Sequence, residues 1–354
     1  MKNKFLSKFD LHKNRLPIYQ NSYYWFILPL AIIFIALVCG TVYSTEGNKY
    51  DGFANVGIDF KGGTVLTVEM TGADMLGSDY EKHVEMINEV VESNGAKATV
   101  PQKSGDSAII VKYQNSIVKD GEAVDYNVAE KTEEMIAIND KIEKEVVNKF
   151  VEKYGTAVRV TANAEMTNAT ASSDLIKKAC LSVGIAMLLM LIYTAIRFDF
   201  FSGIAALCTQ FTDILVMLAC VIIFRIQINS SLIAGLITII AYSINNTIIV
   251  FDRVRENMAP YKHKKEKVDI KDILNGSVSA CVSRALLTSA TTLITITILA
   301  CVGVQTLTDF ALPIIFGILS GLYSSIFIAP SIWGLLMKAK QNNVRKTKKA
   351  RARR

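Results

Sequence analysis

The chain has 354 residues, of which 51% are apolar and 20% are charged, and its net charge is +7 at pH 7. Such a high apolar share beside so many charges excludes an ordinary soluble protein, because the two kinds of residue are separated along the chain. Several stretches of about 20 residues carry almost no charge, which is the length that crosses a hydrocarbon core of about 30 Å as a helix. The sequence therefore predicts an integral membrane protein with one sizeable water-exposed domain.

The first apolar stretch, at 24–43, raises the alternative of a cleaved signal peptide, because basic residues precede it. The stretch is longer than the apolar region of a signal peptide and no convincing cleavage site follows it, so we expect a transmembrane helix. Five more stretches are predicted to span the membrane: Ala179–Ile196, Phe201–Phe224, Ser231–Phe251, Ala285–Val304 and Phe310–Met337. Together these stretches predict six transmembrane helices.

Basic residues gather in three segments, which are the N-terminus, the loop after the fourth span and the C-terminal tail. The positive-inside rule assigns these segments to the cytoplasm. We therefore expect a cytoplasmic N-terminus at 1–23, the first helix at 24–43, an extracytoplasmic domain at 44–173, a five-helix membrane bundle at 174–337 with a basic cytoplasmic loop at 252–284, and a basic cytoplasmic tail at 338–354. We interpret the tail as attracted to anionic membrane lipids rather than to nucleic acid.

The extracytoplasmic domain is predicted to be a small α+β sandwich of the ferredoxin-like kind, because short strands alternate with two helices. Strands are expected at 56–60, 64–70, 107–113 and 158–161, and helices at 79–93 and 127–153. Asp59, Gly62 and Gly63 form a loop motif after the first strand, although paired glycines also occur in ordinary hairpins. His83 is expected to be solvated on a charged helix face.

Enzymatic chemistry is not expected from this sequence. None of the six cysteines lies between the first two spans, and no CxxC spacing suggests a metal site. The three histidines, His12, His83 and His263, are scattered through polar segments, and no catalytic triad or phosphate loop is evident. We therefore expect no cofactor and interpret the outer domain as a binding or lever domain.

Polar and ionisable side chains inside the apolar spans are costly, and each is therefore a functional candidate by default. Asp213 lies near the middle of the third span, where the alternative is a purely structural acid. Ser243, Asn245 and Asn246 lie in the fourth span and suggest an ion or water path or, alternatively, hydrogen bonding between helices. Arg284 opens the fifth span, where snorkelling to the membrane surface would also explain it.

The sixth span carries small residues at a spacing of four, which are Gly317, Gly321 and Ser325. A stripe of small residues on one helix face lets another helix approach closely. We interpret these three residues as helix-packing positions.

Several segments resemble SecF subunits of the SecDF protein-export complex, a family within the RND superfamily. GIDFKGG at 57–63 resembles the element that opens the extracytoplasmic domain in this family. YSIN at 242–245, followed by FDRVREN at 251–257, is similar to its fourth-helix signature. SRALLTSATT at 283–292 and the segment 310–327 are similar to its fifth and sixth helices. The resemblance covers residues 24–337 in the family's order and spacing.

The resemblance implies an accessory subunit of the Sec translocase that, with SecD, promotes preprotein translocation across the bacterial cytoplasmic membrane by using an ion gradient. RND pseudosymmetry calls for twelve helices, so a six-helix chain implies a heterodimer with SecD. It also implies the SecYEG channel, YajC, YidC, the translocating preprotein and membrane lipids as partners. A non-motor scaffold for SecD and the channel is one alternative, and an RND-like small-molecule exporter is another.

One position departs from the family. The resemblance assigns proton coupling to an Asp after YSIN, but this chain has Asn246, which cannot titrate. Asn229 also stands where an acid is expected, and Thr212 replaces a family His. Coupling could shift to Asp213, rest on an acid of the partner subunit, be lost, or use a cation bound by side-chain oxygens; we favour the partner's acid. The candidates for lining the path are Asp213, Asn246, Arg284, Ser243, Asn245 and Asp252.

Overall fold

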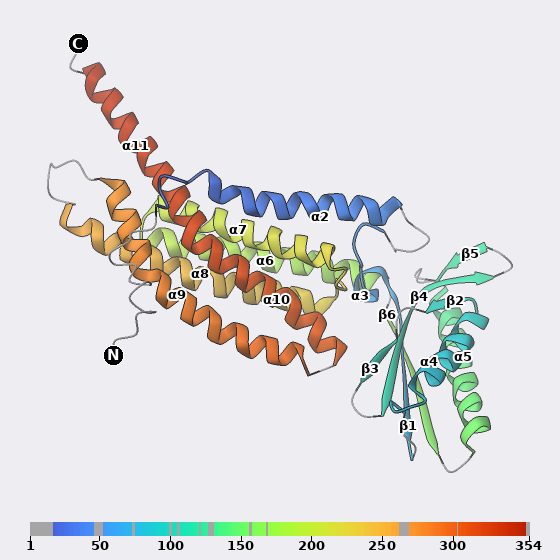
Figure 1. Cartoon of the computed structure of the whole chain (residues 1–354). Helices are drawn as coiled ribbons and strands as arrows, with labels where there is room; N and C mark the ends of the chain where they lie inside the picture. Colours follow the sequence, from blue (N-terminus) through green and yellow to red (C-terminus); the bar gives the residue numbers. More distant parts are fainter. Residues whose placement is uncertain are drawn as a thin grey trace, which may run out of the picture.

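The computed structural model combines a bundle of long helices with an α/β domain at one end of the bundle (Figure 1). It describes residues 17–45, 52–72, 75–98, 101–104, 107–119, 122–126, 131–155, 158–167, 169–261, 269–302 and 304–351. Some of the sequence predictions concern residues outside the described ones. These are the basic N-terminal residues, His12, His263, most of the basic residues predicted in the loop after the fourth span, and the last three residues of the tail.

The described part of the chain contains six helices that are long and apolar enough to cross a membrane, which confirms the predicted number. The first is η1 (Tyr24–Phe26) continued by α2 (Ile27–Thr45), and the next four are α6 (Ala169–Arg197), α7 (Phe200–Ile223), α8 (Ser230–Met258) and α9 (Ile270–Ala300). The sixth combines α10 (Gln305–Tyr323), the π-turn η4 (Ser324–Ile328) and α11 (Ala329–Arg351). A short turn, η3 (Ala259–Tyr261), extends α8.

The loop predicted at 252–284 is much shorter in the structure, because α8 continues to Met258 and α9 already begins at Ile270. Apolar length marks only the part of a helix that can lie in hydrocarbon, so it underestimates helices that extend beyond it. The C-terminal end of α8 and the N-terminal part of α9 pack together, and Asn257 Nδ2 donates to Ser277 Oγ at 2.8 Å. Asp269 caps the start of α9 by accepting from the backbone amide of Lys271 at 3.0 Å.

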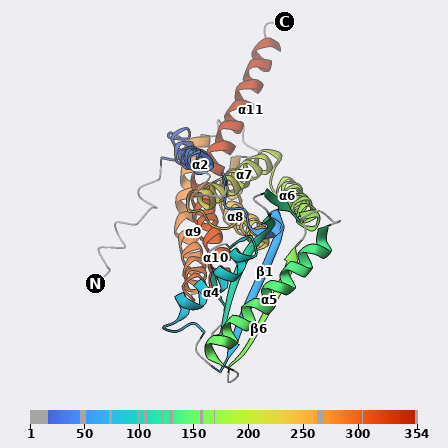
Figure 2. The same cartoon turned by 90° about the vertical axis from the view of Figure 1, so that its right-hand side faces the viewer.

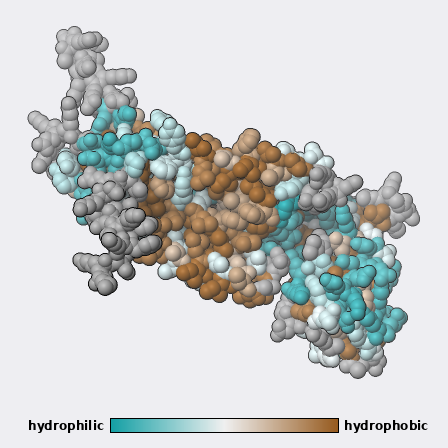
Figure 3. All heavy atoms as spheres, in the orientation of Figure 1, coloured by the Kyte–Doolittle hydropathy of each residue, from teal (hydrophilic) through white to brown (hydrophobic). Residues whose placement is uncertain are grey.

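The centre of the bundle is formed by α7, α8 and the α10–α11 helix. Roughly half of the residues in their most apolar windows are buried, against 6% for α6 and 17% for α2 and α9. On the face drawn in Figure 3, apolar side chains form a band across the bundle, with hydrophilic residues toward both of its ends. The outer helices therefore present apolar faces to the lipid of a membrane, while the inner helices are available to hold polar groups away from it.

The α/β domain has an antiparallel sheet with two helices on the face turned away from the bundle (Figures 1 and 2). Its strands are β1 (Gly63–Thr71), β2 (Ala96–Ala98), β3 (Gln102–Ser104), β4 (Ala108–Lys119), β5 (Glu122–Asp125) and β6 (Arg159–Thr167), and its helices are α4 (Tyr80–Ser93) and α5 (Thr132–Tyr154). The order β2-β4-β1-β6 follows a β-α-β-β-α-β chain path, which confirms the predicted ferredoxin-like fold. The short strands β2, β3 and β5 were not predicted.

The core of this domain follows from the periodicity of its sequence. Alternate residues of β1, Leu66, Val68 and Met70, are buried against the helices. The facing helices bury residues spaced by about one turn, which are Ile87 and Val91 on α4 and Ile142, Val146 and Phe150 on α5. Full burial of each such side chain stabilises the fold by about 1.5–3 kcal/mol.

The segment predicted as a strand at 56–60 instead contains a single helical turn, α3 (Ile58–Lys61). Gly62 ends this turn with φ of +78°, a left-handed conformation that favours glycine. Val56 pairs outside the domain, in a parallel bridge with Ile228 of the α7–α8 loop. The strand prediction was wrong: the segment adds no strand to the sheet, and α3 lies between the sheet and the bundle, in contact with β1 and β4 on one side and α6 on the other.

The prediction that His83 is solvated was also wrong, because only 1% of its surface is exposed. Its Nδ1 lies 2.9 Å from the carbonyl oxygen of Met75, and its Nε2 lies 2.5 Å from the hydroxyl of Tyr154. His83 precedes Ile87 by one turn of α4, so it continues the apolar stripe of that helix. The helical spacing of His83 and Ile87 therefore indicated that His83 is buried, although its neighbours in the sequence are charged.

Candidate functional site

Asp213 lies in the middle of α7, and only 1% of its surface is exposed. Ser243 of α8 and Ser324 of η4 donate hydrogen bonds to its Oδ2, at 2.5 and 2.9 Å. Ser320 of α10 donates to its Oδ1 at 2.8 Å. Within the described residues no Lys or Arg forms an ion pair with this carboxylate, so hydroxyl groups from three segments satisfy it. We call these four residues the Asp213 cluster.

The π-turn η4 aims two consecutive serines into the bundle. Ser324 reaches Asp213, while Ser325 Oγ lies 2.9 Å from Thr247 Oγ1 and donates to the backbone carbonyl of Ser243 at 3.3 Å. Single π-turns inside long helices are frequent at functional sites, because the widened turn changes the direction of the side chains. This turn therefore connects the last transmembrane helix to both α7 and α8 at the level of Asp213.

Two glycines let α10 approach α8 beside this cluster. A Cβ atom on Gly317 would lie 2.3 Å from Ile239 Cδ1, and one on Gly321 would lie 3.2 Å from Ser243 Cβ. Both distances are shorter than an ordinary contact between carbon atoms, which is about 3.5–4.0 Å. A side chain at either glycine would therefore displace the neighbouring residue of α8, and at Gly321 that residue is a donor to Asp213.

Asn246 is as buried as Asp213 but contacts α9 instead. Its Nδ2 donates to Ser289 Oγ over 3.4 Å, and the hydroxyl of Tyr242 donates to the same oxygen at 3.1 Å. Asn246 Oδ1 has no hydrogen-bond partner within the described residues. A buried acceptor without a donor costs about 1–3 kcal/mol, and a water molecule or a small cation at Oδ1 would remove that cost.

Asn245 and Arg284 are not part of either buried group. Both side chains are exposed on the outer surface of their helices, α8 and α9, and within the described residues neither forms a hydrogen bond or ion pair. Polar side chains that face hydrocarbon are costly unless a neighbouring molecule pairs with them. The structure therefore brings together Asp213 and Ser243 but leaves Asn245 and Arg284 directed away from them.

Asp252 lies at the other end of α8 from the α/β domain. Its carboxylate is 3.6 Å from Arg197 and 3.7 Å from Arg255, and about half of the side chain is exposed. It follows Ser243 by nine residues, which is roughly 13 Å along a helix at 1.5 Å per residue. Asp252 therefore belongs to a surface ion-pair network and not to the Asp213 cluster.

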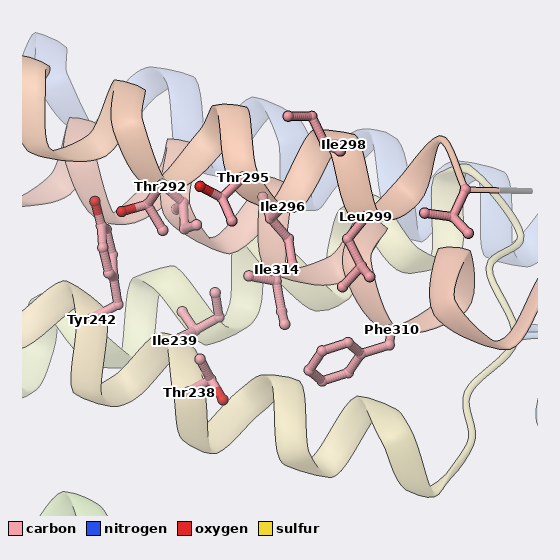
Figure 4. Close-up of a pocket in the computed structure, with 12 residues that line it drawn as sticks. Thr238, Ile239, Tyr242, Thr292, Thr295, Ile296, Ile298, Leu299, Phe310 and Ile314 are labelled. Atoms are coloured by element: carbon pink, nitrogen blue, oxygen red, sulfur yellow. The ribbon is translucent and has the colours of Figure 1, made fainter. Parts of the chain in front are cut away.

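An apolar cavity of about 460 Å³ lies between α8, α9 and α10 (Figure 4). Its lining includes Thr238, Thr292 and Thr295, whose hydroxyls all donate to backbone carbonyls of their own helices. Tyr242 lies at the edge of the cavity and is the residue that connects it to Ser289. Because each of these threonine hydroxyls already donates to a backbone carbonyl, none of them has a hydrogen left to donate to a bound molecule. The apolar lining of the cavity therefore suits hydrocarbon and not an ion.

The loop motif that leads into the α/β domain, Asp59 with Gly62 and Gly63, contacts the membrane bundle. Asp59 Oδ2 accepts hydrogen bonds from the backbone amide and the hydroxyl of Ser230, at 2.9 and 2.6 Å, at the start of α8. Asn229 caps the same helix by accepting from the amide of Leu232 at 3.2 Å. Gly63 is buried, and a Cβ there would lie 2.8 Å from the carbonyl oxygen of Tyr113.

The sequence did not single out Ser320 or Ser324 as ligands of Asp213. The available signal was three serines within the segment 320–325 of an apolar span, where each hydroxyl needs a partner. Among the described residues no group of three or more His, Cys, Asp and Glu side chains is arranged to hold a metal ion. The ionisable group that the structure buries here is the carboxyl group of Asp213, which can bind a proton.

Comparison with known proteins relates this arrangement to a family. Residues 146–339, more than half of the chain, match the family described as Protein export membrane protein SecD/SecF, C-terminal. The chain is 30% identical over 279 residues to protein translocase subunit SecDF of Bacillus subtilis, covering 79% of this chain and 34% of that protein. It is 30% identical over 312 residues to protein translocase subunit SecF of Thermodesulfovibrio yellowstonii, covering 88% of this chain and 92% of that protein.

The fold is also similar to the crystal structure of SecDF from Thermus thermophilus, which is described as a translocon-associated membrane protein. The TM-score is 0.65 at 26% identity, and the alignment covers 94% of this chain and 39% of that chain. The chain thus spans little more than a third of the length of the SecDF proteins that it matches. The chain belongs to the SecD/SecF family of protein-export membrane proteins, and within this family to the SecF proteins.

Proposed function

We propose that this chain is the SecF half of a Sec translocase accessory complex, and that it couples an ion gradient to preprotein translocation through Asp213. The observation that carries the proposal is an ionisable carboxyl group, 1% exposed, that joins two other transmembrane helices, α8 and the α10–α11 helix, by three hydrogen bonds. A change in the protonation of this group would alter all three contacts at once. Asp213 is therefore suited to convert ion binding into movement of helices.

Serine hydroxyls suit a carboxyl group that changes its protonation state. A hydroxyl donates to a carboxylate, but it can also rotate and accept from a protonated carboxyl group. Ser243, Ser320 and Ser324 can thus satisfy both forms of Asp213, although with different directions of their hydrogen bonds. A Lys or Arg partner would instead hold the acid in its charged form. This flexibility favours Asp213 over Asn246, which has no proton to exchange.

The outward faces of α8 and α9 support a partner subunit, which we propose to be SecD. Asn245 is exposed at the middle of α8, and the same face carries the small residues Ala234 and Ala241. Small residues allow close approach of a second helix, and an exposed amide in hydrocarbon is best satisfied across such an interface. Arg284 on α9 would pair with an acid of this partner. The SecYEG channel, YajC, YidC, preproteins and membrane lipids are the further partners that we propose.

The proposed topology has both termini in the bacterial cytoplasm and the α/β domain outside. The C-terminal end of α11 and the α/β domain lie at opposite ends of the bundle (Figure 1). The basic tail and Arg253 and Arg255 at the inner end of α8 are therefore remote from the α/β domain. Under the positive-inside rule the basic end faces the cytoplasm.

The test is preprotein translocation into vesicles that contain the chain, SecD and SecYEG, with proton and sodium gradients collapsed one at a time. We expect Asp213→Asn to lose the gradient-dependent stimulation while it keeps its fold and its partner, because the amide has the same shape and the serine hydroxyls can rotate to accept from it. Asp174→Asn is the matched control, since Asp174 is an exposed acid at the outer end of α6.

The alternative is a scaffold that stabilises SecD and the channel without using a gradient. Asn246 favours this alternative, because it stands at the family's usual acid position, cannot titrate, and leaves its Oδ1 without a hydrogen-bond partner within the described residues. A scaffold would stimulate translocation equally with both gradients collapsed and with Asp213→Asn. That result would overturn the proposed coupling while leaving the export role intact. Export of small molecules by vesicles that contain the chain without SecD would instead indicate a small-molecule exporter.

A further inference from the structure

The loop motif at 57–63 and the α7–α8 loop hold one another through backbone contacts. The backbone amide of Ile228 donates to the carbonyl of Asn55, and the carbonyl of Ile228 accepts from the amide of Gly57, each at 2.8 Å. These two bonds place Val56 beside Ile228 in a parallel bridge. A Cβ at Gly57 would lie only 3.0 Å from the Ile228 carbonyl oxygen, so the close approach requires glycine.

Side chains reinforce the same contact. Asn55 Nδ2 donates to the carbonyl of Arg225 at 3.0 Å, and the Arg225 guanidinium donates to the carbonyl of Gly52 at 2.9 Å. The guanidinium also lies over the ring of Tyr43, 4.8 Å from its centre. Arg225 itself has φ of +55°, which is uncommon for a residue with a side chain and ends α7 with a sharp change of direction.

Asp59 fixes the start of α8 from outside that helix. It accepts from both the amide and the hydroxyl of Ser230, at the end of the helix where backbone amides lack partners and the helix dipole favours negative charge. Asn229 caps the same end with its own side chain. The first turn of α8 is therefore held by one local acceptor and by one acceptor from the segment that leads into β1.

We propose that residues 52–60 and the loop 225–230 form a rigid junction, with Asp59 as its positioning residue, through which α8 and the α/β domain move as one body. The loop 225–230 joins α7, which carries Asp213, to α8, which carries Ser243. A relative movement of these two helices would thus be passed to the α/β domain at its first strand. Lys112 of β4 adds a second contact, because its Nζ donates to Gln227 Oε1 at 3.2 Å.

A rigid junction makes two opposite predictions, and its readout rests on the proposed export function. Breaking the junction with Asp59→Ala should reduce stimulation of translocation to the level seen without the chain. In the full chain, hydrogen exchange in the first turn of α8 should become about 5–30-fold faster, the ratio for a local loss of 1–2 kcal/mol. Asp79→Ala is the matched control, because Asp79 is an exposed acid of the α/β domain whose carboxylate pairs with Lys82 of α4.

Locking the junction should be harmless and should rescue the broken variant. Paired strands lie about 4.8 Å apart, within the Cα separation of about 4.4–6.8 Å that disulfides span, so Val56→Cys with Ile228→Cys can form a disulfide in a background without the six native cysteines. We expect the oxidised lock to leave translocation intact, to restore it in Asp59→Ala, and to lose that rescue on reduction. Redox-dependent rescue within one sample excludes misfolding as the cause of the defect.

Results of two kinds would overturn the junction, one with the lock alone and one with Asp59→Ala. One is an oxidised lock that blocks translocation by itself and releases it on reduction, because the junction would then have to open. The other is Asp59→Ala with wild-type translocation, or with a formed disulfide that does not rescue it. Failure of the proposed coupling is recognised separately, because Asp213→Asn would then translocate like the wild type in the same vesicles.

Discussion

Adding one methyl group to each of two glycines on α10 should separate the packing of the bundle from the chemistry of Asp213. Gly317 and Gly321 lie one turn apart on the same face, and both face α8. At Gly317 the new Cβ would meet Ile239 at 2.3 Å, whereas at Gly321 it would meet Ser243 Cβ at 3.2 Å and Ser243 Oγ at 3.4 Å. The same chemical change thus presses on an apolar residue in one variant and on a donor to Asp213 in the other.

The expected effects on stability differ between the two variants. Ile239 is 1% exposed, and the new Cβ would press on its Cγ1 and Cγ2 as well as on its Cδ1, so turning the side chain toward the cavity would not clear every contact and Gly317→Ala should cost about 1–3 kcal/mol of overpacking. At Gly321 a shift of a few tenths of an ångström relieves the contact. Alanine also favours a helix over glycine by about 1 kcal/mol in both variants, which offsets most of the small cost at Gly321 but only part of the larger cost at Gly317. Gly321→Ala should therefore unfold at nearly the wild-type temperature, and Gly317→Ala several degrees lower.

The expected effects on function are reversed. Gly321→Ala moves Ser243 and disturbs its 2.5 Å hydrogen bond to Asp213, so we expect a reduced response of translocation to the ion gradient. Gly317→Ala should keep that response at temperatures where it is folded. The assay is gradient-dependent translocation into vesicles, beside thermal unfolding of the same preparations. A loss of translocation that simply follows the loss of stability in both variants would refute a specific role of the Ser243–Asp213 contact.

Three further changes test other parts of the structure. Tyr113→Phe should lower the free energy of unfolding by about 1–3 kcal/mol, because Asn139 Oδ1 loses its buried donor. Burial also raises the pKa of the Tyr113 hydroxyl, so the stability that this group contributes is present below about pH 10 and is lost as the pH rises further. This part of the alkaline decrease in melting temperature should be absent from the variant. His83→Leu should cost a similar amount in thermal melts, since it leaves the Tyr154 hydroxyl and a backbone carbonyl without their ring partner, and an unchanged melting temperature would contradict this. Asn246→Asp is isosteric and should fold, and it should add a second titration step to the pH dependence of gradient-stimulated translocation; an unchanged pH profile would show that this position does not exchange protons.

Much of the architecture was accessible from the sequence, because the properties that specify it are local. The spans follow from uninterrupted apolar length, and the α/β domain follows from alternating periods of two and about 3.6 residues. Asp213 could be identified as a candidate because an acid within an apolar span is costly wherever its side chain points. These features depend on neighbouring residues in the chain, so no knowledge of the contacts was needed.

The details of the site depended on which residues meet across long separations in the chain. Ser324 reaches Asp213 only because a π-turn changes the direction of the last helix, and hydropathy does not record helix rotation. Arg284 was expected on the same path, yet its face of α9 points outward.

The segment 57–63 shows the same limit at the edge of the α/β domain. Its apolar residues suggested a strand, but Asp59 caps α8 from 171 positions away in the chain. The sequence by itself thus determined the spans, the fold of the α/β domain and the buried acid. The tertiary structure alone decided which side chains meet that acid and how the two parts are joined, because packing sets the rotation of each helix and the docking of each loop.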